Sequence, residues 1–299
     1  MQIMKSIKIN LQNIAAFGVA GNFTGHLEQA GEARDFANVK TEEANAPKAL
    51  FPTYIPLKSP KTQITPQFLS IFPFDSKTIL YPAGEEKLQI EPECAIICQL
   101  EWKDNRVVDL KPFAFGASND CSIRKDGAKK ISQKKNWGKC SKGLSDNLLP
   151  IDSFTGDGIL GSYRIASFLL RPKAENAATF DIFDYGEDSP VSGYSYIYAK
   201  LVDWLINKLN NQKDEGPAEN INAYLAEAGC PEQVMISVGA TRYTDFGETN
   251  FLQTGDLSAV VVYDQKLYSH QQIANLLTDG KIESAENVSA LVQKVTCAE

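Results

Sequence analysis

The chain has 299 residues, a formal net charge of −7, and 43% hydrophobic and 22% charged residues. These values are typical of an ordinary globular protein that can bury a sizeable core, in one large domain or two. No uncharged apolar run approaches 18 residues, and the first residues lack the continuous apolar segment of a signal peptide. We therefore expect no membrane span and no signal peptide, and hence a cytoplasmic protein.

Two further features limit the possible function classes. Seven lysines fall within residues 125–142, where Trp137 is the one aromatic residue. Because nucleic-acid surfaces combine basic with aromatic side chains, we interpret this stretch as a solvated, mobile loop and expect no nucleic-acid partner. The six cysteines include no CxxC pair, which argues against a structural zinc site and a disulfide framework. Two of them, Cys94 and Cys98, flank an apolar run and are predicted to be core thiols.

The first half of the chain is predicted to form mainly strands. Residues 37–75 contain six prolines, too closely spaced for long helices, so short strands and turns are expected there. Residues 78–102 predict a strand, a glycine-containing turn and a second strand, and residues 107–118 predict another extended segment. In residues 1–20 the apolar spacing mixes periods of 2 and 3.6, which leaves the element type open.

The second half is predicted to mix strands with helices. Apolar residues at helical spacing within residues 194–210 indicate an amphipathic helix, and a shorter helix ends at Gly229. Strands are predicted at residues 165–170, 179–183, 233–241 and 254–264.

The tail, residues 268–299, is predicted to form two short helices, with Ser284 as the N-cap of the second. No internal repeat or low-complexity linker divides the chain. We therefore expect a single, mostly β domain over residues 1–299, with residues 268–299 as a helical C-terminal extension.

An acid pair, Glu91 and Glu93, stands where the apolar segment from Ala95 to Ile97 begins. Residues two apart in a strand face the same side, so both carboxylates would lie together as the chain enters the core. Their repulsion must be offset, and a hard divalent cation held by oxygen ligands would do so. The alternative is that the pair lies at a solvated strand end.

A histidine near the N-terminus, His26, is followed by Glu28, Glu32 and Asp35. A histidine beside acids is a candidate general base, because a carboxylate can tune its pKa and its orientation. A surface histidine at a polar helix start explains the same residues equally well.

Several short motifs occur in a fixed order along the chain. They are Asn22-Phe23-Thr24-Gly25-His26, Glu91-Pro92-Glu93, Asn119-Asp120-Cys121-Ser122-Ile123-Arg124, Trp137 with Lys142-Gly143-Leu144, Gly239-Ala240-Thr241, and Gly255-Asp256. In this order, over about residues 15–265, they resemble the motifs of the fumarylacetoacetate hydrolase superfamily. The resemblance implies a mixed α/β, mostly β fold, with a rolled β-sheet and peripheral helices, and a possible homodimer.

The resemblance also implies a metal site. The carboxylates of Glu91, Glu93 and Asp120 would bind one Mg²⁺, Mn²⁺ or Ca²⁺. Three hard oxygen ligands leave positions open for a bidentate oxo-acid substrate, whose keto or enolate oxygen the ion would polarise.

The same resemblance assigns catalytic roles to further residues. His26 would activate water together with a carboxylate, for which Glu28 and Glu32 are the candidates. Lys142 would neutralise charge that develops on oxygen. Arg124 would hold a substrate carboxylate or support the acidic cluster.

Two departures from the superfamily pattern concern the groups that handle substrate. Gln29 stands where the pattern has glutamate, and Gly127 stands where glutamine is frequent. The first hypothesis is a metal-dependent enzyme that acts on a small 2-oxo acid or 1,3-dicarbonyl compound, by C–C bond hydrolysis or a related decarboxylation or isomerisation. The departures support a second hypothesis, in which the protein is a non-catalytic metal- or ligand-binding protein on the same fold. In a third hypothesis, the acid pair binds nothing and only caps a strand.

Overall fold

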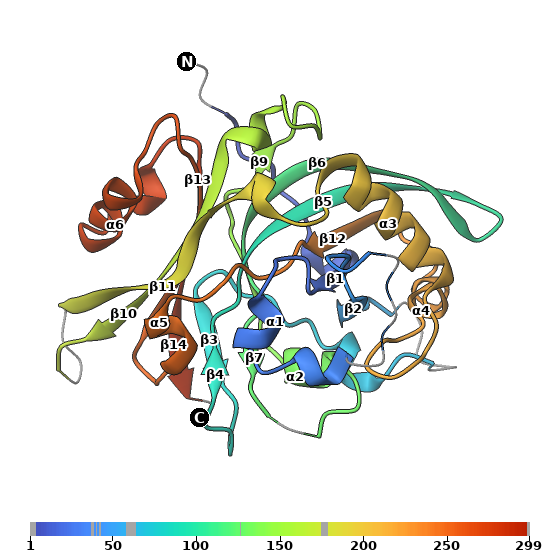
Figure 1. The fold of residues 1–299 in the computed structure, drawn as a ribbon, viewed down its shortest axis with the longest axis horizontal. Coiled ribbons are helices and arrows are strands. Elements are labelled where there is room, and N and C mark those ends of the chain that lie inside the picture. The colour runs from blue at the N-terminus through green and yellow to red at the C-terminus, as the bar shows by residue number, and fades with distance from the viewer. Residues whose placement is uncertain are drawn as a thin grey trace.

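Two β-sheets form the body of the protein (Figure 1). The structure, a computed structural model, describes residues 4–36, 39, 41, 43–57, 64–125, 127–174 and 179–297. The first sheet has the strand order β2 (Ala49–Tyr54), β1 (Ala15–Ala20), β12 (Gln233–Ser237), β5 (Pro92–Lys103), β6 (Arg106–Asn119) and β8 (Gly143–Leu144), and β9 (Leu149–Pro150) also pairs with β6. The second has the order β11 (Phe180–Pro190), β10 (Tyr163–Pro172), β13 (Leu257–Asp264), β14 (Val288–Cys297) and β3 (Thr78–Tyr81).

The remaining elements are a short ribbon and a set of peripheral helices. The ribbon pairs β4 (Leu88–Gln89) with β7 (Ser122–Ile123). The α-helices are α1 (His26–Gln29), α2 (Ser132–Lys135), α3 (Tyr198–Asn211), α4 (Ile221–Glu227), α5 (Asp245–Thr249) and α6 (His270–Thr278). The 3₁₀ turns are η1 (Leu11–Asn13), η2 (Ala33–Phe36), η3 (Gln67–Ser70), η4 (Ile159–Ser162), η5 (Val191–Gly193) and η6 (Ile282–Ser284). The predicted mixed α/β, mostly β class is confirmed.

The main hydrophobic core lies between the two sheets, where β13 and β14 pack on β6. Strand β10 shows how the second sheet is covered on both faces. Its residues Ile165 and Leu169 join the main core, whereas Phe168 and Leu170 pack with Ile273 of α6. Because successive side chains of a strand point to opposite faces, α6 covers the outer face of this sheet (Figure 1).

The predicted amphipathic helix is α3, which packs on β6. Its buried residues Leu201, Leu205 and Leu209 are four apart and form one stripe along the helix. Full burial of each leucine stabilises the fold by about 1.5–3 kcal/mol. The strands predicted at residues 165–170 and 179–183 are also confirmed, as β10 and β11.

A long antiparallel hairpin, β5–β6, positions the site. The two residues of its turn, Asp104 and Asn105, both have positive φ, of 50° and 59°, as a two-residue hairpin turn requires. Pairing runs from the turn back to Pro92 and Asn119, which lie opposite each other. The hairpin therefore brings the start of β5 and the end of β6 to one place.

The helical extension predicted at residues 268–299 is wrong in its second half. The first predicted helix is present as α6, but residues 288–297 form strand β14 inside the second sheet. The strand pairs antiparallel with β13 and parallel with β3, which is about 200 residues earlier in the chain. Those long-range hydrogen bonds outweigh the weak helical preference of the segment.

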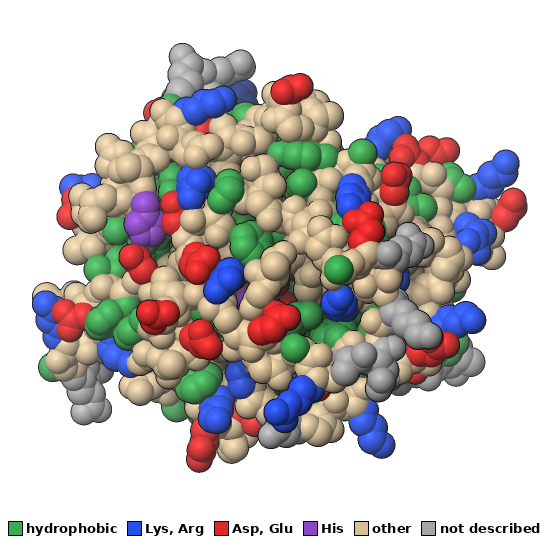
Figure 2. Space-filling view, viewed as in Figure 1, with side chains coloured by type: hydrophobic (Ala, Val, Ile, Leu, Met, Phe, Trp, Pro, Cys, Tyr) green, Lys and Arg blue, Asp and Glu red, His purple; other side chains and the backbone are tan. Residues whose placement is uncertain are grey.

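The surface carries mixed charge. On the face shown in Figure 2, acidic and basic side chains are interspersed, without a large area of one sign. In the described part of the chain, no helix is both long enough and apolar enough to cross a bilayer.

Candidate metal centre

Three carboxylates meet at the end of the β5–β6 hairpin. Because Pro92 lies opposite Asn119, Glu91, which precedes β5, and Glu93, its second residue, lie beside Asp120, which follows β6. One carboxylate oxygen of each lies within 4.8 Å of the oxygens of the other two. Metal–oxygen distances of about 2.0–2.6 Å allow two ligands of one ion to be up to about 5 Å apart. The three carboxylates are therefore close enough to share an ion.

The chemistry of these oxygens suits a hard divalent cation. The three residues are 1–3% exposed. Both oxygens of Asp120 and Oε1 of Glu91 are buried, and their neighbours among the described residues are the charged groups of lysine and arginine side chains. Mg²⁺, Mn²⁺ and Ca²⁺ all prefer carboxylate oxygens, so the donor set fits the group that the sequence predicts.

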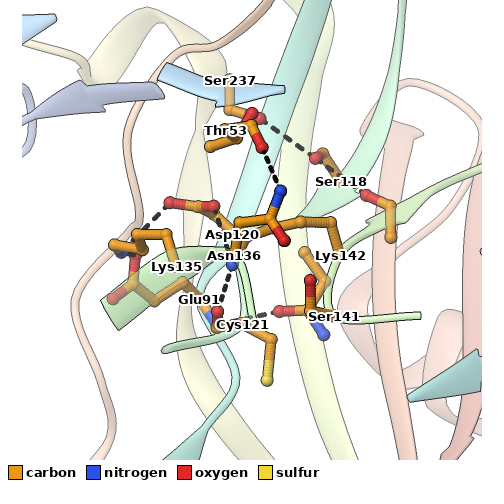
Figure 3. Close-up of polar contacts among 12 residues, drawn as sticks. Thr53, Glu91, Ser118, Asp120, Cys121, Lys135, Asn136, Ser141, Lys142 and Ser237 are labelled. Atoms are coloured by element: carbon orange, nitrogen blue, oxygen red, sulfur yellow. Dashed lines mark hydrogen bonds and ion pairs between the residues drawn. The ribbon is translucent and has the colours of Figure 1, made fainter. Parts of the chain in front are cut away.

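Cationic side chains already face two of the three carboxylates (Figure 3). The Lys135 ammonium pairs with Oε2 of Glu91 and lies 3.0 Å from Oδ2 of Asp120. Arg124 Nη2 lies 2.7 Å from Oε1 of Glu91, and Lys142 Nζ lies 3.2 Å from Oδ1 of Asp120. Lys135 is thus the cation that bridges two of the candidate ligands.

The surrounding charges and burial shift the pKa values of Glu91 and Glu93 in opposite directions. Burial alone would raise the pKa of Glu91, but Lys135 and Arg124 hold it well below its usual value. Burial, together with the charges of Asp120 and Glu91, raises the pKa of Glu93 well above its usual value. Burial alone would lower the pKa of Lys135, but Asp120 and Glu91 raise it, so the ammonium remains charged at neutral pH.

Glu93 is held by the segment after β12. Its Oε2 accepts a hydrogen bond of 2.8 Å from the backbone N–H of Gly239. Gly239 has a φ of +122°, and a Cβ there would come within 3.2 Å of the carbonyl oxygen of Val19. A glycine is therefore required at the position that aims this N–H at Glu93.

Arg124 is built into the acidic cluster. Its Nε donates to Gln89 at 2.6 Å, its Nη1 pairs with Glu32 at 2.8 Å, and its Nη2 also donates to the Tyr243 hydroxyl at 2.8 Å. All three guanidinium nitrogens have protein partners. Arg124 was expected either to hold a substrate carboxylate or to support the acidic cluster, and these contacts agree with the second role.

His26 and Glu28, predicted to act together, point to different environments. His26 is 5% exposed, its ring lies 5.1 Å from that of Tyr243, and its Nδ1 has no hydrogen-bond partner among the described residues. Burial lowers the pKa of His26 to about 4, so it is neutral at pH 7. Glu28 is exposed. Of the two candidate carboxylates of this segment, Glu32 is the buried one.

Comparison with known proteins identifies a family without a described activity. Residues 32–295 match the family of unknown function DUF5718. The chain belongs to this family. No curated protein matches the sequence significantly.

Solved structures match almost the whole chain at low sequence identity. Cg1458 with an inhibitor is 12% identical, with a TM-score of 0.54, over 99% of this chain and 80% of Cg1458. An HpcE protein from Mycobacterium smegmatis is 13% identical, with a TM-score of 0.50, over 96% and 77%. A fumarylacetoacetate hydrolase family protein from Yersinia pestis CO92 is 12% identical, with a TM-score of 0.50, over 94% and 93%. The resemblance to the fumarylacetoacetate hydrolase superfamily is confirmed for the fold.

The basic segment of this DUF5718 protein is partly internal, which corrects its interpretation as a solvated loop. Lys134, Lys135 and Lys142 are at most 5% exposed on their side chains. Lys134 lies 3.1 Å from Glu32, and Lys142 lies 5.2 Å from the centre of the Trp137 ring. Buried carboxylates provide the partners that make burial of these ammonium groups possible.

Strand β14 supplies a supporting residue that the sequence did not indicate. Gln293 is fully buried, and its Oε1 accepts a hydrogen bond of 3.1 Å from the side chain of Asn119. The Oδ1 of Asn119 in turn accepts a hydrogen bond of 3.1 Å from the backbone N–H of Glu91. The C-terminal segment therefore helps to fix a candidate metal ligand. In the sequence, Gln293 alternates with Leu291 and Val295, which places it on the same face of a strand as these apolar residues.

Proposed function

We propose that the protein is a divalent-metal-dependent enzyme that acts on a small 2-oxo acid or 1,3-dicarbonyl compound. The reaction would be C–C bond hydrolysis, or a related decarboxylation or isomerisation. The observation that carries the proposal is the meeting of Glu91, Glu93 and Asp120 oxygens within 4.8 Å, in a buried site lined by cations. Mg²⁺, Mn²⁺ or Ca²⁺ held there would polarise the oxo group of a substrate.

The chain's own residues would supply the remaining steps. Lys142, 3.2 Å from Asp120, would stabilise negative charge on the substrate oxygen as it develops. Burial lowers the pKa of Lys142, which eases proton donation from its ammonium to a carbanion or leaving group. Neutral His26 has a nitrogen free to accept a proton from water or from the substrate carbon. Arg124 would hold Glu91 and Glu32 in place.

A second candidate function is non-catalytic binding of a metal or ligand on the same fold. It is favoured by the amide of Gln29, which cannot serve as a base where the superfamily has glutamate. It is also favoured by the 1–3% exposure of the triad, which leaves a substrate little direct access.

Turnover measurements separate these functions. Acylpyruvates and oxaloacetate are offered with Mg²⁺ or Mn²⁺ to the wild-type protein, and with chelator as the control. We expect metal-dependent turnover that Asp120→Asn abolishes and that Lys142→Met lowers by about 10²–10³-fold. Activity that survives chelation and Asp120→Asn would contradict a metal enzyme. Metal binding without turnover of any 2-oxo acid would favour the non-catalytic function.

A further inference from the structure

We infer that the Lys135 ammonium and a divalent cation compete for the same carboxylates, so that Lys135 must leave Glu91 and Asp120 before the ion binds. The inference deepens the proposed function and rests on its metal site. It concerns a residue of this chain rather than the metal ligands themselves.

Every oxygen of two candidate ligands already faces a cation. Glu91 has Lys135 at Oε2 and Arg124 at Oε1. Asp120 has Lys135 at Oδ2 and Lys142 at Oδ1. A metal that binds any oxygen of Glu91 or Asp120 must therefore either displace the lysine or arginine that contacts this oxygen, or lie beside that cation. Lys135 is the group that contacts both residues, as a bound metal would.

The buried carboxylates already have at least as many cations around them without a metal. Among the described residues, ion pairs connect three buried carboxylates with four buried cations: Glu32, Glu91, Asp120, Arg124, Lys134, Lys135 and Lys142. Glu93, a fourth buried carboxylate, lies beside Glu91 and Asp120. A divalent ion added to this set would leave uncompensated positive charge in a site of low dielectric, which is strongly unfavourable. Removal of the Lys135 ammonium from the carboxylates relieves the nearest repulsion.

The fold offers Lys135 another contact. Its Nζ lies 5.3 Å from the centre of the Phe51 ring, on β2, and a ring face attracts an ammonium. Lys135 is also the last residue of the four-residue helix α2, and Asn136 after it has extended backbone angles. When an ion replaces the ammonium at the carboxylates, the Phe51 ring therefore remains as a partner for Lys135.

The test is Mn²⁺ binding by wild type and Lys135→Met, measured by calorimetry and by the thermal unfolding midpoint with and without Mn²⁺. We expect Lys135→Met to bind Mn²⁺ about 10–100-fold more tightly. We also expect the variant to be less stable than wild type without Mn²⁺, and to gain more than wild type when Mn²⁺ is added, because the ion then supplies the missing charge.

Lys134→Met is the matched control. Lys134 is the preceding residue of α2, is equally buried, and pairs with Glu32 and Asp35 rather than with Glu91 or Asp120. Its loss should lower stability without tightening Mn²⁺ binding. Lys135→Gln is the second variant in case Lys135→Met does not fold. A crystal of the wild-type protein soaked in Mn²⁺ shows the position of Lys135 directly and requires no variant.

The outcomes separate the inference from the function on which it rests. Equal or weaker Mn²⁺ binding by Lys135→Met, or tightening of the same size in Lys134→Met, would overturn competition but leave the metal site intact. In the soaked crystal we expect Lys135 Nζ to have left Glu91. Continued contact with both carboxylates beside a bound ion would also overturn competition. Mn²⁺ binding by neither wild type nor variant would refute the metal site itself.

Discussion

Gln29 and Tyr243 form a reciprocal pair between α1 and the segment after β12. The Gln29 amide donates to the Tyr243 carbonyl at 3.1 Å, and the Tyr243 backbone N–H donates to the Gln29 side-chain oxygen at 2.9 Å. A glutamate at position 29 could accept the second hydrogen bond but could not donate the first. The departure from the superfamily pattern therefore has a structural role: it fixes the segment that carries His26 over Tyr243.

Gln29→Glu should consequently destabilise the protein. The carboxylate would face the Tyr243 carbonyl and would replace an amide that lies 3.3 Å from Glu248. We expect a loss of about 1–3 kcal/mol in the free energy of unfolding by urea. Glu28→Gln is the control, since the neighbouring exposed residue should change stability by less than about 0.5 kcal/mol. Equal stability of Gln29→Glu and wild type would show that the pair contributes nothing.

Gln293→Leu should weaken the metal site without touching a ligand. The substitution removes the acceptor for Asn119, and it removes the donor to the Asp75 carbonyl at 2.9 Å. We expect a loss of about 1–3 kcal/mol of stability from these unpaired groups, and about 10–100-fold weaker Mn²⁺ binding. Lys294→Ala, on the exposed side of the same strand, should change neither. Unaltered Mn²⁺ affinity in Gln293→Leu would remove β14 from the support of the site.

Glu219 should make stability depend on pH. Its carboxyl accepts a hydrogen bond of 2.6 Å from Ser132 at the start of α2, and burial raises its pKa from 4.5 to about 7. The folded state thus binds its proton more tightly than the unfolded state does. This contribution is complete below about pH 4.5 and is lost as pH rises through about 7.

The measurement is the free energy of unfolding of wild type and Glu219→Gln between pH 5 and 8. The amide keeps an acceptor for Ser132 and does not titrate. We expect wild type to lose up to about 3 kcal/mol relative to the variant over this range. Parallel pH profiles would show that Glu219 does not titrate in this range.

The placement of the triad could be predicted partly from the residues and partly from the resemblance. Because side chains alternate along a strand, Glu91 and Glu93 were expected on one face. Asp120 was named as the third ligand by the resemblance to the fumarylacetoacetate hydrolase superfamily. Pairing of Pro92 with Asn119 then brings Glu91, Glu93 and Asp120 together.

The basic segment and the tail could not be predicted in the same way. A run of lysines looks solvated, and the sequence does not reveal that Lys135 turns inward from a four-residue helix toward carboxylates more than ten residues away. In the tail, Ser289 and Gln293 are buried polar residues that interrupt the apolar alternation of a strand. Their burial depends on hydrogen bonds to Ala117 and Asn119, which are formed only in the complete fold.

The most direct test of the metal centre is anomalous X-ray diffraction from crystals soaked in Mn²⁺, for wild type and Glu93→Gln. The variant keeps an acceptor for the Gly239 N–H but loses an anionic ligand. For wild type we predict one anomalous peak at about 2.0–2.6 Å from oxygens of Glu91, Glu93 and Asp120, and for Glu93→Gln a peak that is absent or much weaker. No peak between these carboxylates at saturating Mn²⁺, or an equal peak in the variant, would contradict a metal centre built on this triad.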